Sequence, residues 1–329
     1  MRIGIIGLQG HVGDCLKGAA GWPGARIVAV SDADEAQRVA FLKKQKLAAE
    51  AEAYADWRQL LEHAMFDVAI VADENGVRAE QLSALAERGI PICSEKPLTT
   101  TLDDLARVRA AFEKSPSKLT MLLTMRYQAK YRTIRKLVRD GAVGEVGLVT
   151  SQKSYRVEER PAWQKSRRRL GGMIPYIGIH ALDLMRWTTG LDVSHAAAFH
   201  ANVGTPEFGE TEDTASVLVR FNSGATGTSR LDYLLPETFA THGDDRLRIA
   251  GTEGVIEVQQ AWKHISLTTT KKTTYSIDPG PDENLFLDFL HDVKEGRPCG
   301  MSRDDAFSMT ELVLKIRDAA DGRRMVELG

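Results

Sequence analysis

Short apolar runs alternate with amphipathic stretches through the N-terminal part of the chain. Each apolar run has the length of one strand, and the stretches between the runs carry apolar residues at helical spacing. We predict strands at 2–7, 25–32, 67–72, 90–95 and 119–124, and helices at 11–20, 34–46, 78–89 and 101–114. Strands that alternate with helices of this size favour a doubly wound, parallel sheet of the Rossmann type.

After about residue 125 longer strands with alternating apolar and polar positions replace this rhythm. The predicted strands lie at 144–155, 195–203, 214–221, 225–234 and in a hairpin at 246–259, and the predicted helices at 129–140, 175–189, 283–294 and 303–320. We therefore predict two domains, 1–124 and 125–329. The second domain is expected to be a mostly antiparallel open sheet with helices on one face.

Composition and charge exclude several classes of protein. The chain has 329 residues with 43 basic and 45 acidic side chains, a formal net charge of −2, so no nucleic-acid partner is expected. No apolar run is long enough to span a bilayer, so no membrane partner is expected. Cys15, Cys93 and Cys299 are far apart in sequence and odd in number, which argues against a disulfide framework and favours a cytoplasmic location.

A glycine-rich loop lies between the first predicted strand and the first predicted helix. In "IGIIGLQGHVGD" the glycines are Gly7, Gly10 and Gly13, and Gln9 stands where the common G-x-G-x-x-G fingerprint has its second glycine. A lone glycine pattern is weak evidence. Its place before a helix strengthens it, because a helix N-terminus can receive phosphate charge. The loop therefore predicts a dinucleotide site.

Asp32 ends the second predicted strand. A carboxylate at this place can bind the ribose 2′-hydroxyl and would repel a 2′-phosphate, which favours NAD over NADP. Alternatively, Asp32 caps the following helix, a task that Asp34 could perform equally well.

A predicted helix in the second half carries three polar side chains among apolar residues. Tyr176, His180 and Asp183 are spaced by four and three residues, which places them on one helical face. From this stretch alone, the three are either polar groups satisfied within a packed helix or part of a reactive site.

Two further motifs give the chain a family resemblance. "ICSEKPLTTT" places Glu95-Lys96-Pro97 at the end of a predicted strand, and residues 171–183 follow a G-G-x-x-x-x-x-G-x-H-x-x-D pattern. Together with the glycine loop, "DTASVLVRFNSGA" and "DDAFSMTELVLKIRDAADG", they make nearly the whole chain resemble the Gfo/Idh/MocA oxidoreductases. That family includes glucose–fructose oxidoreductase and inositol dehydrogenase.

The resemblance implies a nicotinamide-dependent dehydrogenase that acts on a sugar, a polyol or a sugar acid. It implies that Lys96 lies beside the nicotinamide and the reacting carbon, and that His180 removes the hydroxyl proton. Histidine suits proton transfer near neutrality, and an ammonium group can hold the substrate oxygen. One departure is that Tyr176 stands where polyol dehydrogenases of the family have an Asp that orients the histidine. Asp183, one turn further on, is the other carboxylate that could do so.

The predicted site residues follow from the motifs and the resemblance together. We predict Lys96, His180 and Tyr176 to be catalytic. The predicted cofactor-binding residues are Gly7, Leu8, Gln9, Gly10, His11, Val12, Asp32, Ala72, Asn75, Glu95, Lys96, Pro97 and Trp163. The predicted substrate-binding residues are Lys96, Tyr155, Tyr176, His180, Asp183, His242 and Asp245.

Other features leave alternatives open. Lys165 and Arg167–Arg169 form a basic run that is either a solvated loop or a grip on an anionic substrate such as a sugar acid or a phosphate. His180, Asp183, His242 and Asp245 are usable metal ligands, but the sequence shows no tight cluster and no metal is expected.

The function also has two rivals. Some relatives keep NAD bound and cleave a glycosidic bond without net redox change, which the missing Asp makes a live alternative. A non-catalytic nucleotide or sugar sensor is the other, supported by the altered glycine loop and Tyr176, and opposed by the retained Lys96 and His180. The resemblance also implies that residues 1–124 bind NAD(P) and that residues 125–329 bind substrate and form oligomers. It implies a homodimer or homotetramer.

Overall fold

The computed structural model describes residues 1–260 and 264–328, which form two compact units. The first unit comprises Met1–Thr124 and Asn284–Thr310, and the second comprises Met125–Glu283 and Glu311–Gly329.

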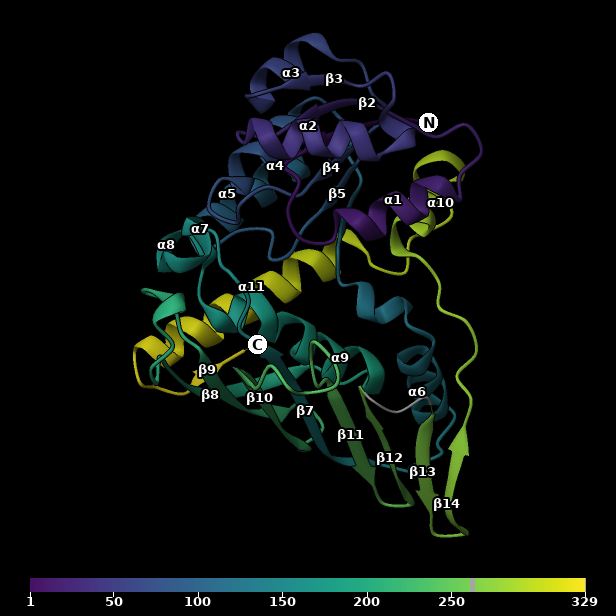
Figure 1. The fold of residues 1–329 in the computed structure, drawn as a ribbon. Helices are drawn as coiled ribbons and strands as arrows, with labels where there is room; N and C mark the ends of the chain where they lie inside the picture. Colours follow the sequence, from purple (N-terminus) through teal and green to yellow (C-terminus); the bar gives the residue numbers. More distant parts are fainter. Residues whose placement is uncertain (261–263, 329) are drawn as a thin grey trace. The chain divides into compact units, whose positions relative to one another are not determined.

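The first unit is a doubly wound sheet, as the alternating pattern predicted (Figure 1). Its six strands are all parallel, in the order β3-β2-β1-β4-β5-β6. The strands are β1 (Arg2–Ile6), β2 (Arg26–Ser31), β3 (Glu52–Tyr54), β4 (Val68–Val71), β5 (Ile92–Ser94) and β6 (Leu119–Met121). The helices that lie wholly in this unit are α1 (Val12–Ala20), α2 (Glu35–Lys44), α3 (Trp57–His63), α4 (Arg78–Glu87), α5 (Leu102–Glu113) and α10 (Leu285–Glu295). Every side chain of β4 is buried, as expected for a central strand with helices on both faces.

The division at residue 124 assigned all later residues to the second domain, whereas 284–310 belong to the first unit. Helix α10 packs against α1. Asn284 caps α10 and donates a hydrogen bond to the carbonyl oxygen of Asp14 at 2.9 Å. The close approach depends on Gly18, where a Cβ atom would overlap the Asn284 side chain. This long-range contact has no signal in the local pattern.

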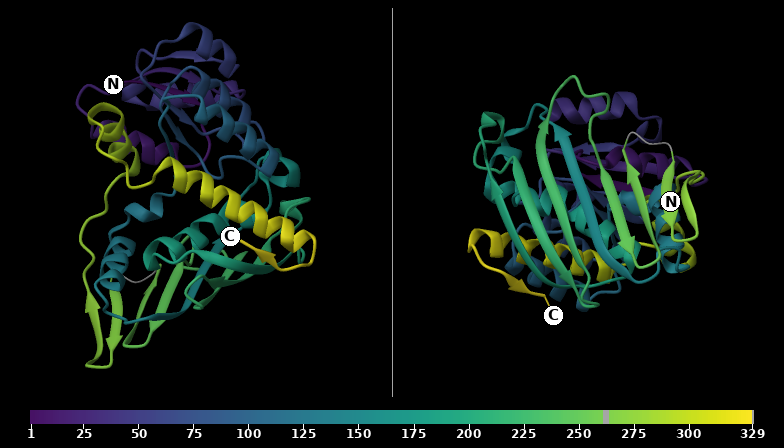
Figure 2. Two further views of the ribbon diagram at one scale, coloured as in Figure 1. Left: turned by 180° about the vertical axis from the view of Figure 1, so that it is seen from behind. Right: turned by 90° about the horizontal axis from the view of Figure 1, so that it is seen from below.

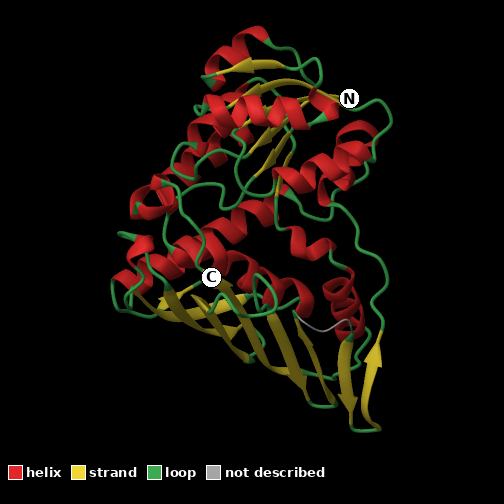
Figure 3. Ribbon diagram, in the orientation of Figure 1, coloured by secondary structure: helices red, strands yellow, loops and turns green. Residues whose placement is uncertain are grey.

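The second unit is built on a nine-stranded sheet in the order β14-β13-β12-β11-β7-β10-β9-β8-β15 (Figure 3). Neighbouring strands are antiparallel except for the parallel pair β7 and β10, so the predicted mostly antiparallel sheet is confirmed. The strands are β7 (Val146–Arg156), β8 (Val193–Ala201), β9 (Thr214–Phe221), β10 (Thr226–Leu235), β11 (Arg246–Gly251), β12 (Gly254–Gln259), β13 (Ile265–Thr269), β14 (Lys272–Ile277) and β15 (Val326–Glu327).

Helices cover one face of this sheet. They include α6 (Ala129–Arg139) and α9 (Ile179–Thr189), which pack against each other, and α9 also contacts β7. Buried and exposed side chains alternate along β9, because its other face is turned away from the helices (Figure 2). Helix α11 (Arg303–Asp321) has its first residues in the first unit and its last in the second. None of the helices in 1–260 and 264–328 combines the length and apolar character needed to cross a bilayer.

Candidate active site

The glycine loop after β1 has a shape that requires glycine at two places. Gly7 has φ +78° and Gly10 has φ +59°, a backbone conformation that side chains with a Cβ disfavour. A Cβ atom at Gly7 would overlap the backbone of Asp73, and one at Gly10 would overlap the carboxylate of Glu95. The Gln9 amide donates to the carbonyl oxygen of Ala72 at 2.9 Å. The loop is therefore held against the ends of β4 and β5.

Asp32 directly follows β2 and holds the same loop by hydrogen bonds. Its carboxylate accepts hydrogen bonds from the backbone amides of Leu8 at 3.0 Å and Asp34 at 2.9 Å. Burial raises the pKa of Asp32, and the nearby charges of Asp73 and Asp34 act in the same direction. Asp34 caps α2 by accepting from the Gln37 amide at 3.2 Å, so the capping role falls to Asp34.

Glu95 anchors the N-terminus of α1. The His11 backbone amide donates to its carboxylate, and the His11 ring Nδ1 lies 2.6 Å from the same oxygen. The Lys96 amide donates to the other oxygen at 2.9 Å. Burial opposes ionisation of Glu95, but His11, Lys96 and Arg78 together hold its pKa well below its usual range. Glu95 is therefore an anion that orders the loop, and the Lys96 side chain beside it is only 6% exposed.

Arg78 is a structural member of this unit that sequence reasoning missed. Its guanidinium is 1% exposed and donates to the carbonyl oxygen of Asp73 at 2.7 Å, to the Asn75 side chain at 2.9 Å and to the carbonyl oxygen of Pro97. It thus joins the loop after β4 to the Glu95-Lys96-Pro97 motif, and it uses the Asn75 oxygen in doing so. A single arginine at the start of a helix carries no periodic signal that would have revealed this.

The loop in the first unit fits a dinucleotide. The first-turn amides of an α-helix have no acceptor within the helix and can receive a phosphate. Helix α1 begins at Val12, and a Cβ atom at Gly13 would meet nothing within 4 Å, so space is open beside this helix terminus.

The helix with the polar face begins with an irregular turn in the second unit. Ile174–Gly178 forms a π-helical turn that leads into α9. Such turns are frequent at functional sites, because they re-aim the side chains that they carry. Tyr176 lies in the π-turn, whereas His180 and Asp183 lie in α9 and are 6% and 1% exposed.

Asp183 is paired with an arginine. Its carboxylate accepts from Arg126 Nε at 2.9 Å and from Arg126 Nη2 at 2.6 Å, and both side chains are buried. This two-point geometry is the strongest that the two groups can form. The hypothesis that Asp183 orients His180 is therefore not favoured, because the carboxylate neutralises Arg126.

Three of the predicted substrate residues, Tyr155, His242 and Asp245, come together near the end of β7 and the start of β11. The rings of Tyr155 and His242 are 5.4 Å apart, and Asp245 pairs with the buried Lys153 at 2.6 Å. Burial raises the pKa of the Tyr155 hydroxyl, and the charge of Asp245 raises it further. Lys153 was missed by sequence reasoning, because an inward-facing lysine interrupts the alternation of an otherwise ordinary strand.

Trp163 and Tyr176 meet edge to face, with ring centroids 6.5 Å apart. The Gln164 amide donates to the Tyr176 hydroxyl at 3.2 Å. The Arg160 guanidinium lies 5.8 Å from the Tyr176 ring centre. Trp163, predicted as a cofactor contact, thus belongs to the surroundings of Tyr176 within the second unit.

Most side chains of the basic run are either exposed to solvent or paired with a carboxylate. Arg167 lies 2.7 Å from Glu212 and 3.1 Å from Asp321, whereas Lys165 and Arg168 are exposed. Arg167 therefore already has carboxylate partners.

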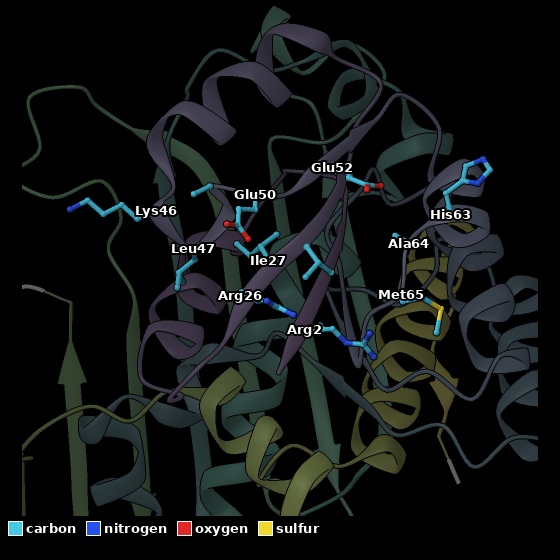
Figure 4. Close-up of a pocket in the computed structure, with 12 residues that line it drawn as sticks. Arg2, Arg26, Ile27, Lys46, Leu47, Glu50, Glu52, His63, Ala64 and Met65 are labelled. Atoms are coloured by element: carbon cyan, nitrogen blue, oxygen red, sulfur yellow. The ribbon is translucent and has the colours of Figure 1, made fainter.

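Two cavities lie within single units, and neither is lined by the predicted site residues. One, of about 540 Å³, lies at the amino ends of β1 and β2, where Arg2 and Arg26 line it (Figure 4). The dinucleotide loop follows the opposite, carboxyl end of β1, so this recess is not the nucleotide site. The other lies in the second unit, between α6, Trp187 and the 279–283 segment. Within the described part of the chain, no group of three or more His, Cys, Asp or Glu side chains is placed to hold a metal ion.

Comparison with known proteins assigns the family. Residues 1–122 match the model of the oxidoreductase family with an NAD-binding Rossmann fold, and residues 131–257 match that of the GFO/IDH/MocA C-terminal domain. The chain belongs to the Gfo/Idh/MocA oxidoreductase family. Its first unit thus contains an NAD-binding Rossmann domain, as the glycine loop predicted.

The relatives extend over essentially the whole chain. An inositol 2-dehydrogenase of Ralstonia nicotianae is 30% identical over 94% of this chain and 90% of its own length. A myo-inositol 2-dehydrogenase of Thermotoga maritima is 26% identical over 100% of this chain and 98% of its own. A solved putative oxidoreductase from Thermotoga maritima is 30% identical, with a TM-score of 0.94 and full coverage of both chains.

Proposed function

We propose that this oxidoreductase oxidises a hydroxyl-bearing carbon of a sugar, polyol or sugar acid with NAD. The observation that carries the proposal is the retention of Lys96 and His180, each 6% exposed, in a chain that aligns along its length with inositol dehydrogenases. A protein that only sensed a nucleotide would have no need of a buried proton acceptor.

The proposed roles follow from the chemistry of each side chain. NAD, when bound, accepts the hydride that leaves the carbinol carbon. The Lys96 ammonium donates a hydrogen bond to the substrate oxygen, and His180 takes the hydroxyl proton. The electron pair of the C–H bond leaves as hydride and that of the O–H bond completes the carbonyl, so one carbonyl product and one proton on His180 result.

Tyr176 assists in this proposal as a positioning and hydrogen-bonding group. Its hydroxyl oxygen accepts a hydrogen bond from the side-chain amide of Gln164 at 3.2 Å. This favours an orientation in which the phenol proton points away from Gln164. A phenol can then donate to a substrate oxygen without carrying charge.

We propose NAD as the cofactor in preference to NADP. Asp32 directly follows β2 and already accepts hydrogen bonds from the Leu8 and Asp34 amides. A carboxylate there can take a ribose hydroxyl, whereas a 2′-phosphate would bring two negative charges beside it. Calorimetric titration with NAD and with NADP tests this, and equal affinity would contradict it.

The function is tested by following NADH formation with NAD and a panel of inositols, aldoses, polyols and sugar acids. Lys96→Met and His180→Ala should each lower kcat by at least about a hundredfold for whichever compound reacts. The matched controls are Lys114→Met and His63→Ala, both at exposed positions, which should keep the wild-type rate. Loss of activity in the controls, or full activity without Lys96 and His180, would contradict the assignment.

The redox-neutral alternative makes a different prediction. An enzyme that cleaves glycosides by transient oxidation consumes substrate without accumulating NADH. Substrate loss without NADH, with NAD binding intact, would favour that alternative, and NAD binding without turnover of any compound would favour the sensor.

A further inference from the structure

Among the described residues of the second unit, three cationic side chains are buried, each less than a tenth exposed. They are Arg126, Lys153 and Arg160, at 5%, 3% and 7% exposed. A buried charge is costly unless an opposite charge or a full set of hydrogen bonds accompanies it. Each of these three side chains is therefore expected to have a carboxylate or hydrogen-bond acceptors beside it.

Two of the three have a carboxylate. Arg126 makes a two-point contact with Asp183, and Lys153 lies 2.6 Å from Asp245. Arg160 has none among the residues that the structure describes, and its Nη1 is buried without a hydrogen-bond acceptor. In this unit, therefore, each of the other two buried cations is paired with a carboxylate of the protein.

Aromatic rings partly replace the missing anion. The Arg160 guanidinium lies 4.0 Å from the ring centre of Phe208, 4.5 Å from that of Tyr233 and 5.8 Å from that of Tyr176. Burial raises the pKa of Tyr233, Tyr176 raises it further, and Arg160 opposes both by its charge and a side-chain hydrogen bond. Aromatic faces stabilise a cation, but they accept no strong hydrogen bond from its N–H groups.

A second hydrogen-bond donor near Tyr176 is also buried without an acceptor. The indole Nε1 of Trp163 is buried without an acceptor, and Trp163 is 6% exposed. Guanidinium and indole N–H groups can only donate. Two groups that can only donate hydrogen bonds therefore lie near Tyr176, which is itself only partly buried and lies one turn before His180.

We propose that the substrate is an anionic sugar derivative whose carboxylate or phosphate oxygens bind Arg160, with Trp163 as a second donor, beside Tyr176. A charge-assisted pair with a planar guanidinium would supply the anion that Arg126 and Lys153 obtain from the protein itself. The inference rests on the proposed function, because it places the reacting hydroxyl within reach of the Tyr176–His180 helix. It assigns substrate binding to Arg160 in preference to the basic run, in which Arg167 is already paired.

The test separates binding from turnover. Calorimetry with the full-length protein and saturating NAD compares D-glucose with D-glucuronate, D-galactose with D-galacturonate, and D-glucose with D-glucose 6-phosphate. At least one acid should bind at least about tenfold more tightly than its neutral partner, and the acid that does so identifies the group as a carboxylate or a phosphate. Arg160→Met should remove this preference, whereas Arg168→Met, at an exposed arginine of the same segment, should keep it.

The outcomes distinguish this inference from the proposed function. A preference for acids that Arg160→Met abolishes supports the anion site even if no NADH is formed, in which case only the proposed reaction fails. NADH formation from neutral compounds with equal or greater kcat/KM, unaffected by Arg160→Met, overturns the anion site and leaves the reaction standing. Failure of every acid to bind in preference to its neutral partner overturns it as well. Because Arg160→Met could disturb the aromatic cluster, Arg160→Lys is the second variant, which keeps the charge and should retain part of the preference.

Discussion

At the scale of single residues, buried charges decide how this protein is held and what it can bind. Glu95, Asp183 and Asp245 each meet a charged or donor-rich environment inside their own unit. None of these partnerships follows from sequence spacing, because each joins residues on separate elements. They lead to two predictions.

Glu95→Gln should destabilise the protein at neutral pH and much less in acid. The folded-state pKa of Glu95 is depressed, so its ionised form stabilises the fold above the ordinary value of 4.5 and that contribution is lost as pH falls toward the folded pKa. Each pH unit below about 4.5 should narrow the gap between wild type and variant by about 1.4 kcal/mol. Urea unfolding at pH 7 and pH 3 measures this. Glu80→Gln, at an exposed pair with Arg58, should change stability by less than about 1 kcal/mol, and a gap for Glu95→Gln that is independent of pH would refute the assignment.

Asp183→Asn should lower the free energy of unfolding by about 3–5 kcal/mol, because it removes the carboxylate that neutralises the buried Arg126. The pH at which the rate reaches half its maximum should stay close to that of the wild type, since Asp183 serves Arg126. Asp140→Asn, which breaks an exposed pair with Lys136, is the control for stability. A large shift of the pH profile with unchanged stability would instead show that Asp183 orients His180.

At the scale of secondary-structure elements, helices with clear boundary signals were predicted, whereas short elements with weak signals were not. Thr101 caps α5 by accepting a hydrogen bond from the Asp104 amide at 3.1 Å, and Gly190 ends α9 with φ +73°, so both predicted helices have a clear local boundary signal. By contrast, β3 and α3 were not predicted. Strand β3 is a three-residue edge strand in which Glu52 and Ala53 are exposed and Tyr54 is only partly buried. An edge strand of that length carries too little alternation to be recognised.

The site was predictable where a motif fixes it and unpredictable where packing does. The glycine loop, Glu95-Lys96-Pro97 and His180 could be named from sequence, since each has a motif around it. The π-turn that carries Tyr176 could not, because helical spacing gives no sign of an inserted residue. Arg160 could not either, because its significance lies in the carboxylate that it lacks.

The glycine loop yields a prediction at this scale. Gly7→Ala should lower NAD affinity by at least about tenfold, because an L-residue at φ +78° is strained and its Cβ would overlap the Asp73 backbone. Gly13→Ala is the matched control for stability: a Cβ there meets nothing and the residue lies in α1, so the thermal midpoint should stay or rise. Calorimetry with NAD and thermal unfolding measure both. Unchanged NAD affinity in Gly7→Ala would contradict the proposed loop geometry.

At the scale of the whole molecule, the open face of the second-unit sheet bears on assembly. Figure 2 shows this face without a covering helix among the described residues. Phe199, Leu218, Leu148 and Leu234 are 75%, 54%, 39% and 53% exposed, on four adjacent strands of the sheet. Exposed apolar side chains gathered in this way favour association, consistent with the homodimer or homotetramer that the resemblance implies.

We propose that this face forms the contact between copies. Leu218→Glu should then convert an oligomer to a monomer, because it places a charge on the exposed apolar face. Light scattering after size-exclusion chromatography measures the mass. Val39→Glu places the same charge on an exposed apolar position of α2 and should leave the mass unchanged. A wild-type protein that is monomeric at micromolar concentration would contradict this use of the sheet.

In the proposed reaction, NAD is reduced as a sugar, polyol or sugar acid undergoes net oxidation. The most direct measurement is the amount of NADH formed per substrate consumed in deuterated water, with wild type and with Lys96→Met. For the wild type, one NADH is expected per carbonyl product, with no solvent deuterium in recovered substrate. In the variant, both NADH and the carbonyl product should be lost. Substrate consumption without NADH, accompanied by solvent deuterium beside the reacting carbon, would contradict the proposed reaction and establish redox-neutral cleavage.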